Sequence, residues 1–268
     1  MRGRGISGLA LLVAGLIFAW QYFGAEKFTN PETGRTAKVG LSMQQELALG
    51  FQSYRQVLAQ SRPITSGPQF EMVRTVASKL ASATGKSGQG MEWQVSLIDD
   101  GQVNAFCLPG GKIVVYTGII PVAQNAPGLA TVMGHEMAHA TSRHGAQRVL
   151  QQNLTQTALT GVAVSLGDMD YEKQRAIMGA LGAGAQYGIL MPFGRHHESE
   201  ADEIGLLYMA RAGYDPQESL RFWRRMDEAS RGGPPEFLST HPSHGTRIQQ
   251  LQAVMPKALE EYKRATGR

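Results

Sequence analysis

Cysteine is nearly absent from this sequence. The 268 residues contain one, Cys107, so an intrachain disulfide is excluded and the redox compartment is not indicated. Cys107 lies between Phe106 and Leu108, and no histidine or other base accompanies it in a recognisable motif. We therefore interpret it as a small buried hydrophobic residue rather than a nucleophile.

Charged residues are also scarce. They make up 18% of the chain, against 42% hydrophobic residues, and the net charge is +4. This composition is typical of a folded globular protein with one large domain or two small ones. No dense cluster of Lys and Arg interleaved with aromatics suggests nucleic-acid binding. Lys86, in a glycine-rich loop, lacks the G-x-x-x-x-G-K context of a phosphate loop, so we expect no nucleotide either.

The stretch from Ala130 to Leu150 carries the most specific pattern in the chain. It contains His135, Glu136 and His139 in the spacing H-E-x-x-H. Apolar residues recur at helical spacing and no proline or glycine run interrupts the stretch after Gly134, so we expect a buried helix. Two histidines four residues apart can ligate one metal ion, and Glu136 can direct its carboxylate to a water on that metal. The pattern is typical of a peptide-cleaving zinc site.

Two histidines rarely complete a zinc site, so a third ligand must come from elsewhere. Glu198 and Asp202 are four residues apart and face the same way on a second predicted helix. The small residues Ala201 and Gly205 would let this helix approach the first one closely. We predict that Glu198 is the third ligand and that Asp202 accepts the second ring N–H of a ligand histidine. Glu200 is expected to point away, toward solvent.

Two alternatives are disfavoured. Core histidines held by hydrogen bonds would bury three polar groups on one apolar helix, which is costly unless a metal compensates them. The metzincin arrangement needs glycine three and histidine six residues after the second ligand, where this sequence has Ser142 and Gly145. His196 and His197 directly precede the predicted third ligand, and we assign them to the entrance of the second helix.

Four motifs of this sequence resemble those of one group of metallopeptidases and occur in the same order along the chain. HEMAH at 135–139 is followed by ESEAD at 198–202 and THPSHGTRI at 240–248, and NAFCLPGGKIVVYTG at 104–118 is similar to the segment before the metal-binding helix of that group. The group is the gluzincins that include the HtpX heat-shock proteases, the CAAX prenyl proteases and the periplasmic BepA-like enzymes. The resemblance covers about residues 40 to 255. It implies an α+β, mostly helical zincin fold with a small sheet, one zinc ion per chain, and quality control of misfolded envelope or membrane proteins.

The resemblance also assigns roles near the end of the chain. It aligns His241 with a residue that can occupy the fourth position on zinc in a resting enzyme, and Arg247 with one suited to stabilising the tetrahedral oxyanion. His244 and Pro242 lie on the same loop, where the proline would stiffen it. The alternative is that these residues only cap the last helix. We expect Glu136 and Arg247 to be catalytic and His241 to act as a latch.

An apolar run from Ile6 to Phe23 follows Arg2 and Arg4. Its helical length of about 27 Å nearly matches a hydrocarbon core of about 30 Å. No small-x-small cleavage site follows it, so we expect an uncleaved membrane anchor at residues 1–24. Arg2 and Arg4 lie on the short N-terminal side of the run, and positive charges favour the cytoplasmic side of a membrane. This predicts a single-pass inner-membrane protein whose catalytic domain is periplasmic. The alternative is a periplasmic protein after signal cleavage.

The rest of the chain is predicted to be a polar linker, 25–40, and a zinc metallopeptidase domain, 41–268. Helices are expected over 41–60 and 70–83, and strands over 92–98 and 113–117. The run from 176 to 193 is long enough for a second membrane segment but weakly apolar, so packed helices are favoured there.

The second predicted strand leads towards the metal helix. We expect Ile113, Val114, Val115 and Tyr116 to form an edge strand that binds extended substrate through main-chain hydrogen bonds. The predicted function is a zinc-dependent endopeptidase acting on unfolded or misfolded proteins. The alternative is a non-catalytic, chaperone-like binding protein with a structural zinc, but such a site needs four protein ligands and no Glu136. No repeat units follow the last predicted helix, so the tetratricopeptide tail of some BepA-like relatives is not expected.

Overall fold

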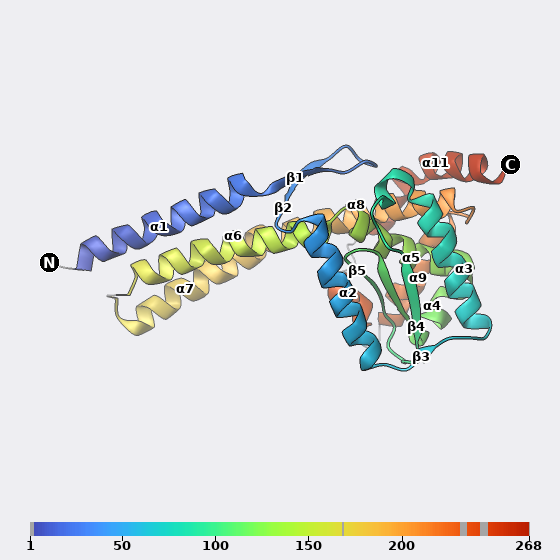
Figure 1. Cartoon of the computed structure of the whole chain (residues 1–268), viewed down its shortest axis with the longest axis horizontal. Coiled ribbons are helices and arrows are strands. Elements are labelled where there is room, and N and C mark those ends of the chain that lie inside the picture. The colour runs from blue at the N-terminus through green and yellow to red at the C-terminus, as the bar shows by residue number, and fades with distance from the viewer. Residues whose placement is uncertain (1–2, 168, 231–234, 242–245, 268) are drawn as a thin grey trace. The chain divides into compact units, whose positions relative to one another are not determined.

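A four-stranded sheet is the scaffold of one of the two units into which the chain divides, the unit formed by residues 30–34, 43–144 and 197–268. The computed structural model describes residues 3–167, 169–230, 235–241 and 246–267. The strand order is β3-β4-β6-β5, with β6 parallel to β4 and antiparallel to β5 (Figure 1). The strands are β3 (Pro63–Ile64), β4 (Gln94–Ile98), β5 (Ala105–Leu108) and β6 (Lys112–Tyr116).

Strand β6 is central, so the prediction that residues 113–116 form an edge strand is wrong. Strands β4 and β6 agree with the strands expected from the sequence, whereas β5 was not expected. Strand β5 precedes β6 in a hairpin closed by Gly110 and Gly111, both with positive φ. This hairpin inserts β6 between β4 and β5. Ile113, Val114 and Val115 are all buried, as in a strand with neighbours on both sides. Within the described residues, β5 is the end strand on this side of the sheet.

Helices pack on both faces of the sheet because its strands alternate apolar side chains between the faces. Leu97, Ile113 and Val115 join the main core with α3 (Pro68–Ala83) and α5 (Ala126–Thr141). Ile98 and Val114 point the other way and pack with Tyr54 of α2 (Met43–Ala59). The other helices of this unit are α4 (Ile120–Ala123), α9 (Glu218–Ala229), α10 (Glu236–Thr240), α11 (Arg247–Thr266) and the part of α8 (Met191–Arg211) from residue 197. The predicted α+β, mostly helical fold is confirmed.

Helix α5 is shorter than the sequence suggested. It begins after Asn125, whose side chain accepts a hydrogen bond from the backbone N–H of Gly128, a favourable N-cap. It ends at Thr141 instead of continuing to Leu150, and α6 (His144–Ser165) follows at once. Arg143 between them has a φ of 53°, a left-handed conformation that turns the chain sharply. The predicted single helix over 130–150 is therefore two helices.

The second unit contains residues 1–29, 35–42 and 145–196. Figure 1 shows its three long helices, α1 (Gly3–Gly24), α6 and α7 (Tyr171–Ala185), running beside one another. The stretch predicted to be a linker carries a hairpin of β1 (Glu26–Thr29) and β2 (Thr36–Val39). Among the described residues, the helical segment Tyr171–Arg211 is long and apolar enough to cross a membrane, and Gly8–Gly24 is a shorter apolar helix.

Candidate active site

Two glycines bring the two predicted metal-binding helices into backbone contact. A Cβ atom added at Gly205 of α8 would lie 2.7 Å from the backbone nitrogen of His135, and one at Gly134 of α5 would lie 2.9 Å from the carbonyl oxygen of Gly205. Real Cβ atoms do not approach so closely, so the crossing requires glycine on both helices. The close approach expected from the small residues of the second helix is present.

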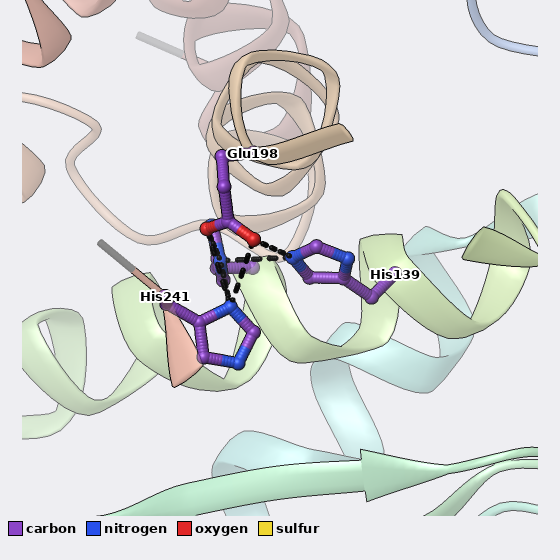
Figure 2. A group of neighbouring side chains, drawn as sticks. His139, Glu198 and His241 are labelled. Atoms are coloured by element: carbon purple, nitrogen blue, oxygen red, sulfur yellow. Dashed lines mark hydrogen bonds and ion pairs between the residues drawn. The ribbon is translucent and has the colours of Figure 1, made fainter. Parts of the chain in front are cut away.

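At this crossing the predicted ligands converge. The Nε2 atoms of His135 and His139 are 3.1 Å apart, and the carboxylate of Glu198 lies 3.3 Å from the first and 3.4 Å from the second. His241, which follows α10, places Nδ1 3.1 Å from Glu198 Oε1. Figure 2 shows the side chains of His139, Glu198 and His241 pointing toward one another from three separate segments. One potential ligand atom from each of the four residues lies within 4.8 Å of all the others.

The site is buried and its electrostatics are dominated by acidic groups. Burial alone would lower the pKa of His135, but hydrogen bonds and charge from Asp202 and Glu198 outweigh it and raise that pKa to about 10. Burial would raise the pKa of Glu198, yet hydrogen bonds from His135 and His241 hold it below the usual value. Burial, with the neighbouring His135 charge, lowers the pKa of His139. The carboxylates of Glu198 and Asp202 therefore favour a positive charge at the position of His135.

Glu136 lies between the ligand cluster and strand β5. Its Oε2 atom accepts a hydrogen bond from the backbone N–H of Cys107 at 3.3 Å. Its Oε1 atom is buried without a hydrogen-bond partner among the described residues, although His241 Nε2 is 3.4 Å away. Burial raises the pKa of the Glu136 carboxyl group. Burial also raises the pKa of the Cys107 thiol well above its usual value, which agrees with its interpretation as an unreactive residue.

Asp202 and Arg247 contact the predicted ligands. Asp202 Oδ1 is 2.9 Å from Nδ1 of His135, the contact predicted for it. The guanidinium of Arg247 donates from Nε to Asp202 Oδ2 at 2.7 Å and from Nη2 to Glu198 Oε2 at 3.2 Å. It also stacks over the Trp223 ring at 4.1 Å, and its Nη1 atom is buried without a hydrogen-bond partner in the described part of the chain.

A second set of polar residues, not expected from the sequence, lies beside His139. His144 Nδ1 is 2.9 Å from His139 Nδ1, and its Nε2 atom is 3.0 Å from Glu200. Glu200 is only 6% exposed, so the expectation that it faces solvent is wrong. The signal for this set was His144, the third histidine of the stretch, which the turn at Arg143 brings back toward the site.

Two further described histidines, His196 and His197, are not part of the cluster of predicted ligands. His197 is buried and stacks on His144 with ring centroids 4.0 Å apart, outside the ligand cluster. His196 is exposed near the start of α8. His244 and Pro242, which were expected on the loop with His241, lie outside the described residues.

The donor set fits a metal ion. The Nδ1 atoms of both His135 and His139 already have partners, so in the neutral imidazoles the two adjacent Nε2 atoms present lone pairs to each other. Glu198 adds a third donor atom, which is negatively charged, and the Glu136 Oε1 atom, which has no hydrogen-bond partner among the described residues, is nearby. Two imidazoles and one carboxylate are a ligand set that suits zinc with one open position.

Comparison with known proteins agrees with this geometry. Residues 68–255 match the model of peptidase family M48. The mitochondrial metalloendopeptidase OMA1 of Saccharomyces cerevisiae is 33% identical over 259 residues, which are 88% of this chain and 71% of that protein. Human OMA1 is 31% identical over 267 residues, 94% of this chain and 50% of that protein. The beta-barrel assembly-enhancing protease of Yersinia pestis is 33% identical over 228 residues, 83% of this chain and 46% of that protein.

Proposed function

Because this chain belongs to peptidase family M48, and is therefore a metalloendopeptidase, we propose that His135, His139 and Glu198 bind one zinc ion for peptide hydrolysis. The observation that carries the proposal is the convergence of these three side chains beside the carboxylate of Glu136. When bound, the zinc ion would act as a Lewis acid that polarises the scissile carbonyl and lowers the pKa of a water to about 7.

Glu136 is the proposed general base. Its carboxylate is held by the Cys107 amide at one oxygen, while the other oxygen has no hydrogen-bond partner among the described residues. A carboxyl group whose pKa is raised by burial takes up a proton more readily than an exposed one. Glu136 would take a proton from the attacking water and pass it to the leaving amine.

Arg247 is proposed to stabilise the oxyanion, and His241 is proposed to block the site in a resting state. The Arg247 Nη1 atom is the guanidinium nitrogen that no described residue accepts from, so it is the donor left to a developing oxyanion. The His241 ring is within 3.4 Å of both Glu198 and Glu136, where it would exclude the catalytic water in a resting state. His241 must move aside before substrate enters.

The substrate is proposed to be an extended, unfolded segment of protein bound along β5. In an antiparallel pair, alternate residues direct their backbone groups away from the partner strand. Tyr116 donates its backbone N–H to Asn104, so Ala105 and Cys107 are the residues whose backbone groups face outward from β6. The Cys107 N–H points to Glu136 itself, so a strand added here would pass directly over the site.

The proposed place of action is the cell envelope. The names of the relatives describe a mitochondrial metalloendopeptidase and a β-barrel assembly protease, and quality control of misfolded envelope or membrane proteins is the role we infer for this chain. Helix α1 exposes large apolar side chains, including Leu16 and Trp20, which suits an anchor in the inner membrane. We call the unit that contains the candidate site, residues 30–34, 43–144 and 197–268, the catalytic unit, and we infer that it lies on the periplasmic side.

Cleavage of an unfolded protein tests this function. The purified full-length chain in detergent should contain one zinc ion and degrade casein, lose the activity with a chelator, and regain it with added zinc. A chain that binds casein and zinc but never cleaves it would instead be the chaperone-like binding protein with a structural metal.

A further inference from the structure

His139 contacts a third imidazole that the proposed mechanism does not use. His139 Nδ1 and His144 Nδ1 are 2.9 Å apart, and His144 Nε2 is 3.0 Å from Glu200 Oε2. His144 is 1% exposed and Glu200 is 6% exposed. The ring of His197, stacked at 4.0 Å with an angle of 9° between planes, keeps the His144 ring from turning. The three groups therefore form a fixed, buried chain that ends on a predicted ligand.

The other oxygen of Glu200 is anchored by a segment far away in sequence. Glu200 Oε1 accepts hydrogen bonds from Asn30 Nδ2 at 3.1 Å and from Thr33 Oγ1 at 2.8 Å. Asn30 Nδ2 also donates to Ser142, and Asn30 Oδ1 accepts from the backbone N–H of Glu32 at 2.9 Å. This last bond fixes the Asn30 amide with its NH2 group toward Glu200.

For neutral imidazoles these contacts permit one arrangement of protons. A carboxylate only accepts hydrogen bonds, so His144 must donate from Nε2 to Glu200 and present its Nδ1 atom as an acceptor. His139 must then donate from Nδ1 to His144. Its Nε2 atom is left with a lone pair directed at the ligand cluster.

We propose that Glu200 and His144 are a positioning relay that holds His139 in the tautomer able to bind the metal. The inference rests on the metal site proposed above. Asp202 acts on His135 directly at 2.9 Å, whereas Glu200 acts on His139 through one intervening imidazole. Partners of this kind fix the ring orientation and tautomer of metal-binding histidines. Helix α8 would then supply both the third ligand and the two carboxylates that orient the other ligands.

Glu200→Gln tests the relay without changing the shape of the side chain. The new amide NH2 group cannot face Asn30, which presents only donors there. It must face His144 and donate to Nε2, which moves the ring proton of His144 to Nδ1. His139 would then have to accept at Nδ1 and carry its own proton on Nε2, where the metal binds. The substitution therefore opposes the metal-binding tautomer.

The measurement is zinc affinity of the full-length chain, by competition with a chromophoric chelator, together with the visible spectrum of the cobalt(II)-substituted protein. Glu200→Gln should weaken zinc binding by about 10- to 100-fold and change the cobalt spectrum. The matched control is Glu203→Gln, the same change on the same helix at a site that pairs only loosely with Lys257 at 3.5 Å. It should bind zinc as the wild type does.

A second variant separates tautomer control from packing. In His144→Asn the Oδ1 atom of the asparagine takes the place of the histidine Nδ1 atom and can still accept a hydrogen bond from His139. The shorter asparagine side chain has no group in the place of Nε2, so it makes no hydrogen bond to residue 200. The double variant Glu200→Gln/His144→Asn should therefore recover most of the zinc affinity that Glu200→Gln loses, which a purely structural role would not allow. Equal zinc affinity for Glu200→Gln and Glu203→Gln, or a double variant weaker than either single one, would overturn the relay. A wild-type chain that binds no zinc would overturn the proposed function as well.

Discussion

Gly205 of α8 lies against the backbone of His135 in α5, with no room for a single methyl group between them: an added Cβ would sit 2.7 Å from the His135 nitrogen. The neighbouring atoms are backbone and cannot turn aside. The third proposed ligand and the first are therefore positioned by one helix crossing, and the spacing of the site depends on a residue with no side chain.

Replacing that glycine should disturb the site from a distance. Gly205→Ala forces α8 away from α5, at a cost of about 1 to 3 kcal/mol of unfolding free energy, and should also weaken zinc binding. The control is Gly179→Ala in α7, where an added Cβ meets nothing within 4 Å. It should be neutral or slightly stabilising, since alanine favours helix. Equal thermal stability of the two variants would contradict the close crossing.

Arg247→Ala should slow turnover while the metal is retained. Loss of one donor to an oxyanion typically costs about 100- to 1,000-fold in kcat. Zinc content, measured by elemental analysis beside the casein assay, should remain one per chain. Arg224→Ala, an exposed arginine on α9, is the control and should be fully active. If Arg247→Ala loses zinc in proportion to activity, the arginine holds the carboxylates Glu198 and Asp202 and takes no part in the reaction.

His241→Ala tests the latch. Removing an imidazole that lies 3.1 Å from Glu198 and 3.4 Å from Glu136 should open the fourth position and raise the casein cleavage rate above that of the wild type. His196→Ala, a change at an exposed histidine, should leave the rate unchanged. A His241→Ala variant that is fully active but no faster than wild type would mean that the loop is only structural.

The anchor is tested by fractionation. The full-length chain should remain in the membrane pellet after alkaline carbonate washing, because α1 presents exposed apolar residues such as Leu9 and Phe23. Protease added to the periplasmic side should digest the catalytic unit. A mature chain that starts near Ala25 and is recovered in the soluble fraction would instead establish cleavage of a signal peptide.

Local patterns predicted most of the helical fold and the side chains that meet at the candidate site. Two histidines at four-residue spacing and two carboxylates at the same spacing depend only on helix geometry, so His135, His139, Glu198 and Asp202 could be placed before any tertiary contact was known. The small residue Gly205 signalled the close crossing for the same reason.

Strand order and helix ends depend on non-local contacts. Nothing in the pattern of β6 says that β5 lies beside it, because a buried central strand and a buried edge strand are equally apolar. Helix α5 ends just before Arg143, a non-glycine residue in a left-handed conformation, which the sequence pattern does not predict. The polar contacts of Glu200 come from Asn30 and Thr33, about 170 residues earlier in the chain, so helical spacing alone assigned it to solvent.

Glu136 is proposed to perform acid–base chemistry at a metal held by His135, His139 and Glu198. The most direct test compares casein cleavage by wild type and Glu136→Gln, with zinc measured in the same preparations. Glutamine keeps the shape of the side chain but cannot take up a proton, so the variant should retain one zinc ion and lose cleavage by at least about 100-fold. Wild-type protein with stoichiometric zinc that cleaves casein no faster than Glu136→Gln would contradict the account.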